Sequence, residues 1–121
     1  MGKTALVVDD SPSIRQLVGF TLQEAGFEVI QAGEGKQALE ALGGRPIQLV
    51  ITDLNMPVMD GLALIRSLRA QPAYRFVPIL MLTTESQESK KLEGKAAGAT
   101  GWIVKPFTPD TLLQVVARVV R

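Results

Sequence analysis

The sequence contains no cysteine and no histidine. Without cysteine, the chain has no disulfide scaffold, no thiolate zinc site and no thiol nucleophile. Without histidine, imidazole acid–base chemistry and histidine–metal ligation are also excluded. Any chemistry must therefore use carboxylates, lysine, hydroxyls and backbone groups, together with a hard metal ion that prefers oxygen ligands.

Neither sign of charge dominates, and no apolar run is long. The 13 basic and 12 acidic residues leave a net charge of +1, which gives no reason to expect nucleic acid as a partner. The first apolar run stops at Val8, too short for a signal peptide or a membrane span. We therefore expect a cytoplasmic monomer that does not insert into membranes, folded as a single domain over residues 1–121.

Short apolar runs alternate with longer segments of helical period. We predict strands at residues 5–8, 27–31, 47–51, 79–82 and 102–104, and helices at 12–25, 34–42, 62–68, 86–97 and from 109 onward. The pairs Ser11-Pro12 and Thr108-Pro109 have the residue types of helix starts. Four of the strands are apolar throughout, as expected when helices cover both faces. The pattern predicts an α/β fold, (βα)5, with a doubly wound parallel five-stranded sheet.

Polar residues follow each central strand where it ends. They are Asp9, Asp10, Asp53, Thr83, Thr84 and Lys105. In an open parallel sheet, sites form outside the carboxyl ends of the strands. We therefore expect these side chains, although distant in sequence, to converge at one edge.

This set of residues suits phosphoryl transfer to a carboxylate. Clustered carboxylates repel one another unless a cation joins them, and magnesium is the natural ion. Asp53 can act as a nucleophile that forms an aspartyl phosphate. Lys105 supplies positive charge and Thr83 a hydroxyl for the phosphoryl oxygens. Taken singly, each residue fits a turn, a helix cap or a solvated surface; their coincidence at one edge favours a shared function.

Several segments match a known family. They are VDDS at 8–11, DLNMP at 53–57, DG at 60–61, LTT at 82–84 and GATGWIVKPF at 98–107. With these segments the chain resembles receiver domains of bacterial response regulators over essentially its whole length, most of all stand-alone chemotaxis regulators of the CheY type. The resemblance implies the flavodoxin/CheY-like strand order 2-1-3-4-5.

The resemblance also implies a metal and phosphate site. Asp53 would be the phospho-acceptor. Asp10 and Asp53 would bind Mg²⁺ directly, Asp9 partly through water, and Asn55 through its backbone carbonyl. Backbone N–H groups of Asn55 and Thr84 would contact the phosphoryl group.

Further positions are implied to control the switch. Lys105 would pair with the phosphoryl group, Thr83 would move to bond it, and the Lys105-Pro106 peptide would be cis. Asn55 and Glu85, each two residues after a site residue, would tune dephosphorylation. Trp102 stands where the family has a switching aromatic, usually Tyr, Phe or His; a packing residue on an outer strand is the alternative.

The resemblance implies a signalling switch rather than an enzyme acting on outside substrates. It would catalyse its own phosphotransfer and autodephosphorylation. Its partners would be a CheA-like histidine kinase and a downstream target protein, such as the flagellar motor switch. Residues 86–97 are the expected moving helix, because Leu92 is its only large apolar residue and Gly94 weakens it. Lys90, Lys91 and Lys95 would give it a positive face for an acidic partner.

Three other classes compete with this interpretation. A haloacid-dehalogenase-type phosphatase places its nucleophile in a D-x-D pattern after the first strand and carries a cap domain, whereas this chain has Asp9-Asp10. A flavodoxin-like FMN carrier would need a Ser/Thr/Gly-rich phosphate loop after the first strand. A pseudo-receiver, a purely structural binding module, would not need the complete acidic and basic set.

Overall fold

The computed structural model describes residues 2–84 and 88–120, which form one parallel sheet flanked by helices. The elements are β1 (Lys3–Val8), α1 (Pro12–Glu24), β2 (Phe27–Ala32), α2 (Gly35–Leu42), β3 (Leu49–Asp53), α3 (Gly61–Ala70), the 3₁₀ helix η1 (Pro72–Tyr74), β4 (Ile79–Thr83), α4 (Glu88–Ala97), β5 (Gly101–Val104) and α5 (Pro109–Val119). The strand order is β2-β1-β3-β4-β5, and all four pairings are parallel. The predicted fold class and strand order are confirmed.

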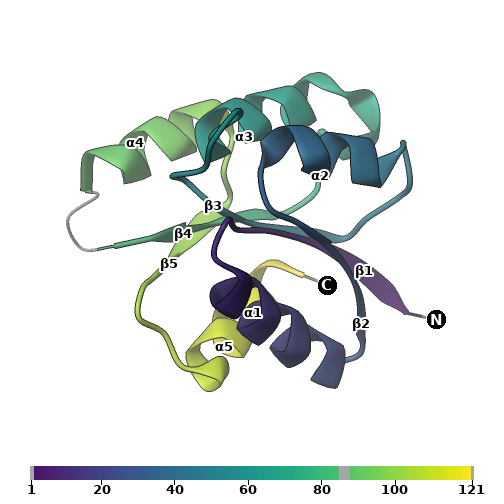
Figure 1. Ribbon diagram of the computed structural model, residues 1–121, viewed down its shortest axis with the longest axis vertical. Helices are drawn as coiled ribbons and strands as arrows, with labels where there is room; N and C mark the ends of the chain where they lie inside the picture. Colours follow the sequence, from purple (N-terminus) through teal and green to yellow (C-terminus); the bar gives the residue numbers. More distant parts are fainter. Residues whose placement is uncertain (1, 85–87, 121) are drawn as a thin grey trace.

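The sheet is the middle of three layers. Figure 1 shows α1 and α5 on one face and α2, α3 and α4 on the other. Successive residues of β1 alternate between the two cores: Ala5 and Val7 belong to the α1–α5 side, and Leu6 and Val8 to the other. Because both faces are covered, β3 and β4 are buried throughout and are apolar at every position up to their polar ends.

Most predicted boundaries shift by one or two residues. Strand β3 begins at Leu49 rather than at residue 47, because Gln48 instead ties the chain to Thr4 through backbone and side-chain hydrogen bonds. Glu34 is the N-cap of α2, accepting hydrogen bonds from two backbone N–H groups, so it precedes the helix instead of starting it. The predicted start of the fourth helix, at residue 86, lies outside the described residues.

Helix α4 meets the sheet through a glycine. Leu92, its expected anchor, is 74% exposed, whereas Gly94 is buried. A Cβ atom at Gly94 would lie 1.9 Å from Met81 Sδ on β4. The sequence interpretation took Gly94 as a weakness of the helix; in the structure it packs closely on the Met81 side chain, which would have to shift if this position carried a Cβ atom.

The charge on α4 is also smaller than the sequence suggests. Lys90 Nζ lies 3.3 Å from Glu93 Oε2, and Lys91 Nζ lies 3.0 Å from Glu88 Oε1. Two of the three lysines of the expected positive face therefore have acidic partners on their own helix. Among the described residues, no helix has the length and apolar character needed to cross a membrane.

Candidate functional site

Parallel pairing brings the polar strand ends to one edge of the sheet. In the register of the central strands, Val8 is opposite Thr52, Asp53 is opposite Leu82, and Thr83 is opposite Val104. The residues next in sequence, Asp9 after β1 and Lys105 after β5, therefore emerge beside Asp53 and Thr83. The convergence predicted from the sequence is confirmed.

Three carboxylates form the centre of the site. One oxygen from each of Asp9, Asp10 and Asp53 lies within 4.8 Å of the others. Asp9 is fully buried, Asp53 is 8% exposed and Asp10 is exposed. Such a set of hard oxygen donors, open on the side of Asp10, fits a magnesium ion better than a softer metal.

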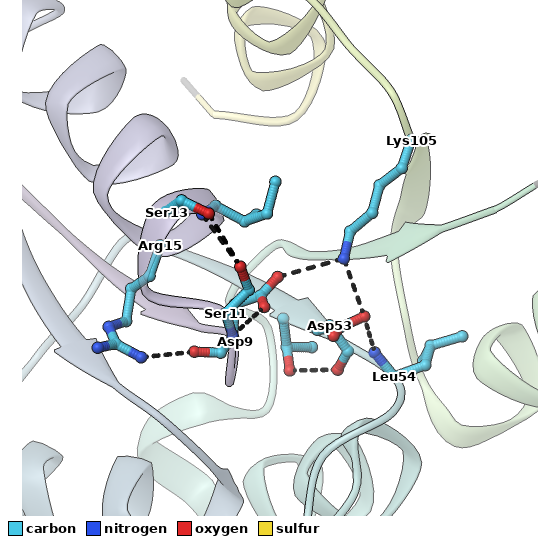
Figure 2. A network of polar contacts seen from close by, with 9 residues as sticks. Asp9, Ser11, Ser13, Arg15, Asp53, Leu54 and Lys105 are labelled. Atoms are coloured by element: carbon cyan, nitrogen blue, oxygen red, sulfur yellow. Dashed lines mark hydrogen bonds and ion pairs between the residues drawn. The ribbon is translucent and has the colours of Figure 1, made fainter.

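Lys105 joins the two buried carboxylates. Its Nζ atom lies 3.3 Å from Asp9 Oδ2 and 3.4 Å from Asp53 Oδ1. Figure 2 shows the ammonium group reaching between both side chains from the loop after β5. The preceding backbone is fixed by a hydrogen bond from Lys105 N–H to the Thr83 carbonyl, and the Lys105-Pro106 peptide is cis, as the family resemblance implies.

Backbone groups orient the same carboxylates. Ser11 N–H donates to Asp9 Oδ1, and Leu54 N–H donates to Asp53 Oδ1, each at 2.8 Å. The Arg15 guanidinium donates to the main-chain carbonyl of Asp9 at 2.7 Å. The sequence analysis did not identify Arg15, because a contact with a main-chain carbonyl leaves no signal in the sequence.

The pKa of Asp53 is raised above its ordinary value of 3.8. Burial is the main cause and the negative charge of Asp9 is the second, because both disfavour the carboxylate. Lys105 and the Leu54 N–H act in the opposite direction and do not fully offset these effects. The site therefore favours the arrival of further positive charge, as a metal ion would provide.

The loop from β3 to α3 and the first residue of α3 pack against the backbone of Asp53. Asp60 caps α3 by accepting a hydrogen bond from Ala63 N–H at 2.9 Å. Gly61, the first residue of α3, lies against the backbone of Asp53, where a Cβ atom would be 2.2 Å from the Asp53 carbonyl oxygen. Within the same loop Val58 is 80% exposed and has a φ of 67°, a left-handed conformation that β-branched residues rarely adopt.

The predicted phosphate contacts occupy the same edge. The Thr83 hydroxyl is buried and has no hydrogen-bond partner among the described residues. Asn55 is exposed in the loop two residues beyond Asp53, and Thr84 follows Thr83 at the end of β4. Glu85, the other predicted tuning residue, lies outside the described part of the chain.

Trp102 lies on the edge strand β5 and is 41% exposed. The ring centroid is 5.5 Å from Lys91 Nζ on α4, a cation–π distance. In the register of the sheet, Trp102 is opposite Met81, the residue that packs on Gly94. The ring thus lies at the junction of α4 and β5 in a partly solvated position.

The fold and the site define a class: a doubly wound α/β protein with an acidic, lysine-bridged site at the carboxyl edge of its sheet. The family described as the response regulator receiver domain matches residues 5–117. The chain belongs to the response regulator receiver domain family, and within it is of the CheY type, a signalling switch of phosphorelays.

The relatives are chemotaxis proteins and receiver domains. The chain is 41% identical over 109 residues to the chemotaxis protein CheY1 of Helicobacter pylori, covering 88% of each chain. It is 52% identical to the chemotaxis response regulator CheY4 of Vibrio cholerae, with a TM-score of 0.93 over 99% of this chain and 100% of that one. A receiver domain of the Pseudomonas aeruginosa sensor kinase PA1611, 28% identical with a TM-score of 0.89 over 98% of both chains, has a magnesium ion in its active-site cleft.

Family membership excludes two of the three competing classes. A haloacid-dehalogenase-type phosphatase and an FMN carrier are both excluded, because the matched family spans nearly the whole chain. The third alternative, a pseudo-receiver that binds partners without phosphorylation, belongs to the same fold. Only the chemistry of Asp53 distinguishes it from a working receiver.

Proposed function

We propose that this protein accepts a phosphoryl group on Asp53 and signals by binding another protein. One observation carries the proposal: the Asp53 carboxylate is buried, lies 3.4 Å from Lys105 Nζ and belongs to a cluster of three carboxylates. A purely structural fold gains nothing from burying two acidic side chains at one point, since each pays a desolvation penalty.

The reaction is a displacement at phosphorus. A carboxylate oxygen of Asp53 forms a bond to the phosphorus of a phosphohistidine, the P–N bond breaks, and the imidazole nitrogen leaves with the bonding electrons. Lys105 neutralises charge on the transferred group, and the Leu54 N–H holds the carboxylate in place. Positioning and electrostatics carry such reactions, so the lack of histidine in this chain is no obstacle.

Magnesium is the proposed cofactor. When bound, the ion neutralises the acidic cluster and the charge of the phosphoryl oxygens. Asp9, Asp10 and Asp53 would hold it, with the backbone carbonyl of Asn55 as a further ligand. The clustering of the three carboxylates supports this assignment, as does the magnesium found in the related Pseudomonas receiver domain.

The same groups give the phosphorylated state its signal. A phosphoryl group adds roughly −1.5 to −2 charges and three acceptor oxygens. The buried Thr83 hydroxyl offers a donor for one of them, and the backbone N–H groups of Asn55 and Thr84 are the other proposed contacts. Thr83 is opposite Val104 in the pairing of β4 with β5, so a shift of Thr83 would change the packing of β5. Trp102, on the same strand, is the proposed reporter of that change. Asn55 and Glu85 are proposed to set the rate of autodephosphorylation.

The partners follow from the relatives. Because proteins named for chemotaxis match almost the whole chain, we assign the pathway to chemotaxis. The phosphoryl donor is then a CheA-like histidine kinase, and the flagellar motor switch is the proposed target. Such a kinase draws on nucleoside triphosphate, so the proposed location is the cytoplasm.

Acetyl phosphate tests the assignment directly. The protein is incubated with acetyl phosphate and Mg²⁺, and the mass gain of one phosphoryl group is followed together with Trp102 emission. We expect labelling in the parent and in Asp60→Asn, a control that changes an exposed carboxylate of the same loop. Asp53→Asn should remain unlabelled. Equal labelling of Asp53→Asn and the parent, or no labelling of the parent, would refute the proposed acceptor.

A further inference from the structure

We propose that Arg15 is a positioning residue that fixes Asp9 and thereby sets the Mg²⁺ affinity of the three-carboxylate cluster. The inference rests on the proposed function in one respect only, namely that the cluster binds Mg²⁺. It assigns a role to a residue that lies outside the carboxylate, lysine and threonine set discussed above.

The contact is specific in its geometry. Arg15 lies in the first turns of α1, partly buried, and its Nη1 atom donates to the Asp9 carbonyl oxygen at 2.7 Å. The guanidinium also lies beside the turn after β2, where a Cβ atom on Gly33 would be 3.5 Å from Nη1. Figure 2 shows Arg15 reaching the main chain of Asp9 from one side while Lys105 reaches its carboxylate from the other.

Together with three other contacts, the Arg15 bond gives every polar group of Asp9 a partner. Its N–H donates to the Ala32 carbonyl at 3.2 Å, its Oδ1 accepts from Ser11 N–H at 2.8 Å, and its Oδ2 lies 3.3 Å from Lys105 Nζ. The aspartate side chain is short, so the position of its carboxylate follows the position of its peptide group. A clamp on the carbonyl therefore fixes where the carboxylate lies.

Arg15 has two opposing effects on a bound cation. As a positive charge near the cluster, the guanidinium weakens Mg²⁺ binding. As a clamp on Asp9, it strengthens binding by preorganising a ligand. Guanidinium groups usually pair with carboxylates in a bidentate manner, but this contact goes to a carbonyl and leaves the carboxylate oxygens to the metal. We infer that the clamp outweighs the charge.

The two effects predict opposite results for one substitution. Arg15→Met keeps the length of the side chain but removes both charge and donor. If the clamp dominates, Mg²⁺ affinity falls about tenfold or more, the usual range for loss of a group that orients a metal ligand. If charge dominates, affinity rises. Arg15→Lys keeps a donor and the charge, so its affinity should lie closer to the parent than to Arg15→Met.

The measurement is calorimetric titration of the metal-free protein with MgCl₂, without any phosphoryl donor. Arg45→Met is the matched control, because Arg45 also donates to a backbone carbonyl, that of Ala41 at 2.9 Å, after α2 and away from the carboxylates. It should bind Mg²⁺ like the parent. Arg15→Ala, which gains helix propensity, replaces Arg15→Met if the latter does not fold.

The outcomes separate this inference from the proposed function. A parent that binds no Mg²⁺ would contradict the proposed function itself. A parent that binds Mg²⁺, with folded Arg15→Met binding it as tightly or more tightly, would overturn the role of Arg15 alone. Equal losses in Arg15→Met and Arg45→Met would also overturn it, since the effect would then be one of general stability.

Discussion

Replacing Gly61 with alanine tests whether the fold holds Asp53 through its backbone. A Cβ atom at this position would lie 2.2 Å from the Asp53 carbonyl oxygen and 2.9 Å from Leu54 Cα. Both obstacles are main-chain atoms of a buried strand end, so neither can move aside as a flexible side chain would. The Gly61 N–H also donates to the Leu54 carbonyl at 3.0 Å, which ties the start of α3 to this strand.

The magnitude follows from two opposing contributions. Alanine is favoured over glycine in a helix by about 1 kcal/mol. Overpacking against a rigid neighbour costs about 1–3 kcal/mol or more, and a 2.2 Å approach to backbone belongs at the upper end. We therefore expect Gly61→Ala to lower the free energy of unfolding by about 2 kcal/mol. For 121 residues this corresponds to a fall in melting temperature of about 8 °C.

Gly19→Ala is the matched control. Gly19 is also a buried glycine in a helix, but its nearest obstacle is the side-chain amide of Gln31 at 3.0 Å, the end of a flexible chain. This variant should be as stable as the parent or more so, by up to about 1 kcal/mol.

The assay is urea unfolding of both variants, followed by labelling with acetyl phosphate. Gly61→Ala should lose labelling rate as well as stability, because the clash moves the acceptor itself and small displacements of reacting groups are costly. If Gly61→Ala is as stable as Gly19→Ala and is labelled at the parental rate, the idea that this glycine positions Asp53 is wrong.

Three other substitutions test the electrostatics and the strain of the site. Val58→Asn should raise stability by about 1 kcal/mol in thermal unfolding, because asparagine tolerates the left-handed φ of 67° that valine adopts there, whereas Val58→Ala should gain much less. Lys91→Ala should shift Trp102 emission to the red by uncovering the ring, whereas Lys91→Arg should keep the parental spectrum. Asp53→Asn, in the presence of a chelator, should be more stable than the parent at neutral pH. The native pKa of Asp53 is raised, so the protonated form contributes stability that is lost as pH rises through that pKa. The gain should shrink as the pH falls toward 3.8; a gain that does not change with pH would refute this electrostatic account.

The sheet was predictable because its pattern is redundant. Apolar runs, helix caps and alternation of the two element types all indicate the same (βα)5 fold, and the structure has that order. The boundaries were less predictable, since side-chain contacts decide them. Gln48 reads as part of an apolar run, but its amide oxygen accepts from Thr4 N–H at 2.7 Å and the strand starts one residue later.

The site residues were predictable for a different reason. Topology alone brings the ends of parallel strands together, so residue type at the ends of β1, β3, β4 and β5 was enough to place the carboxylates, Thr83 and Lys105. The residues that position these side chains were not predictable. Gly61 stands in the Asp60-Gly61 pair that matches the family, but the sequence does not show that this glycine lies against Asp53. Gly94 also acts through close approach, and Arg15 acts on a carbonyl that every residue possesses.

At Gly94 the sequence and the structure give different pictures of α4, the helix that is expected to move on phosphorylation. From sequence, a glycine within a helix suggests a loosely held element. In the structure the same residue lets α4 approach Met81, which is paired in register with Trp102. Leu92 points to solvent, so the contact at Gly94 is a main attachment of α4 to β4. Ala97 also packs against this core, so α4 is attached by small residues at two points. Such an attachment can still allow two helix positions, which would depend on Met81 rather than on the flexibility of glycine. A signal that starts at Asp53 and displaces β4 would therefore reach α4 and Trp102 through the same methionine.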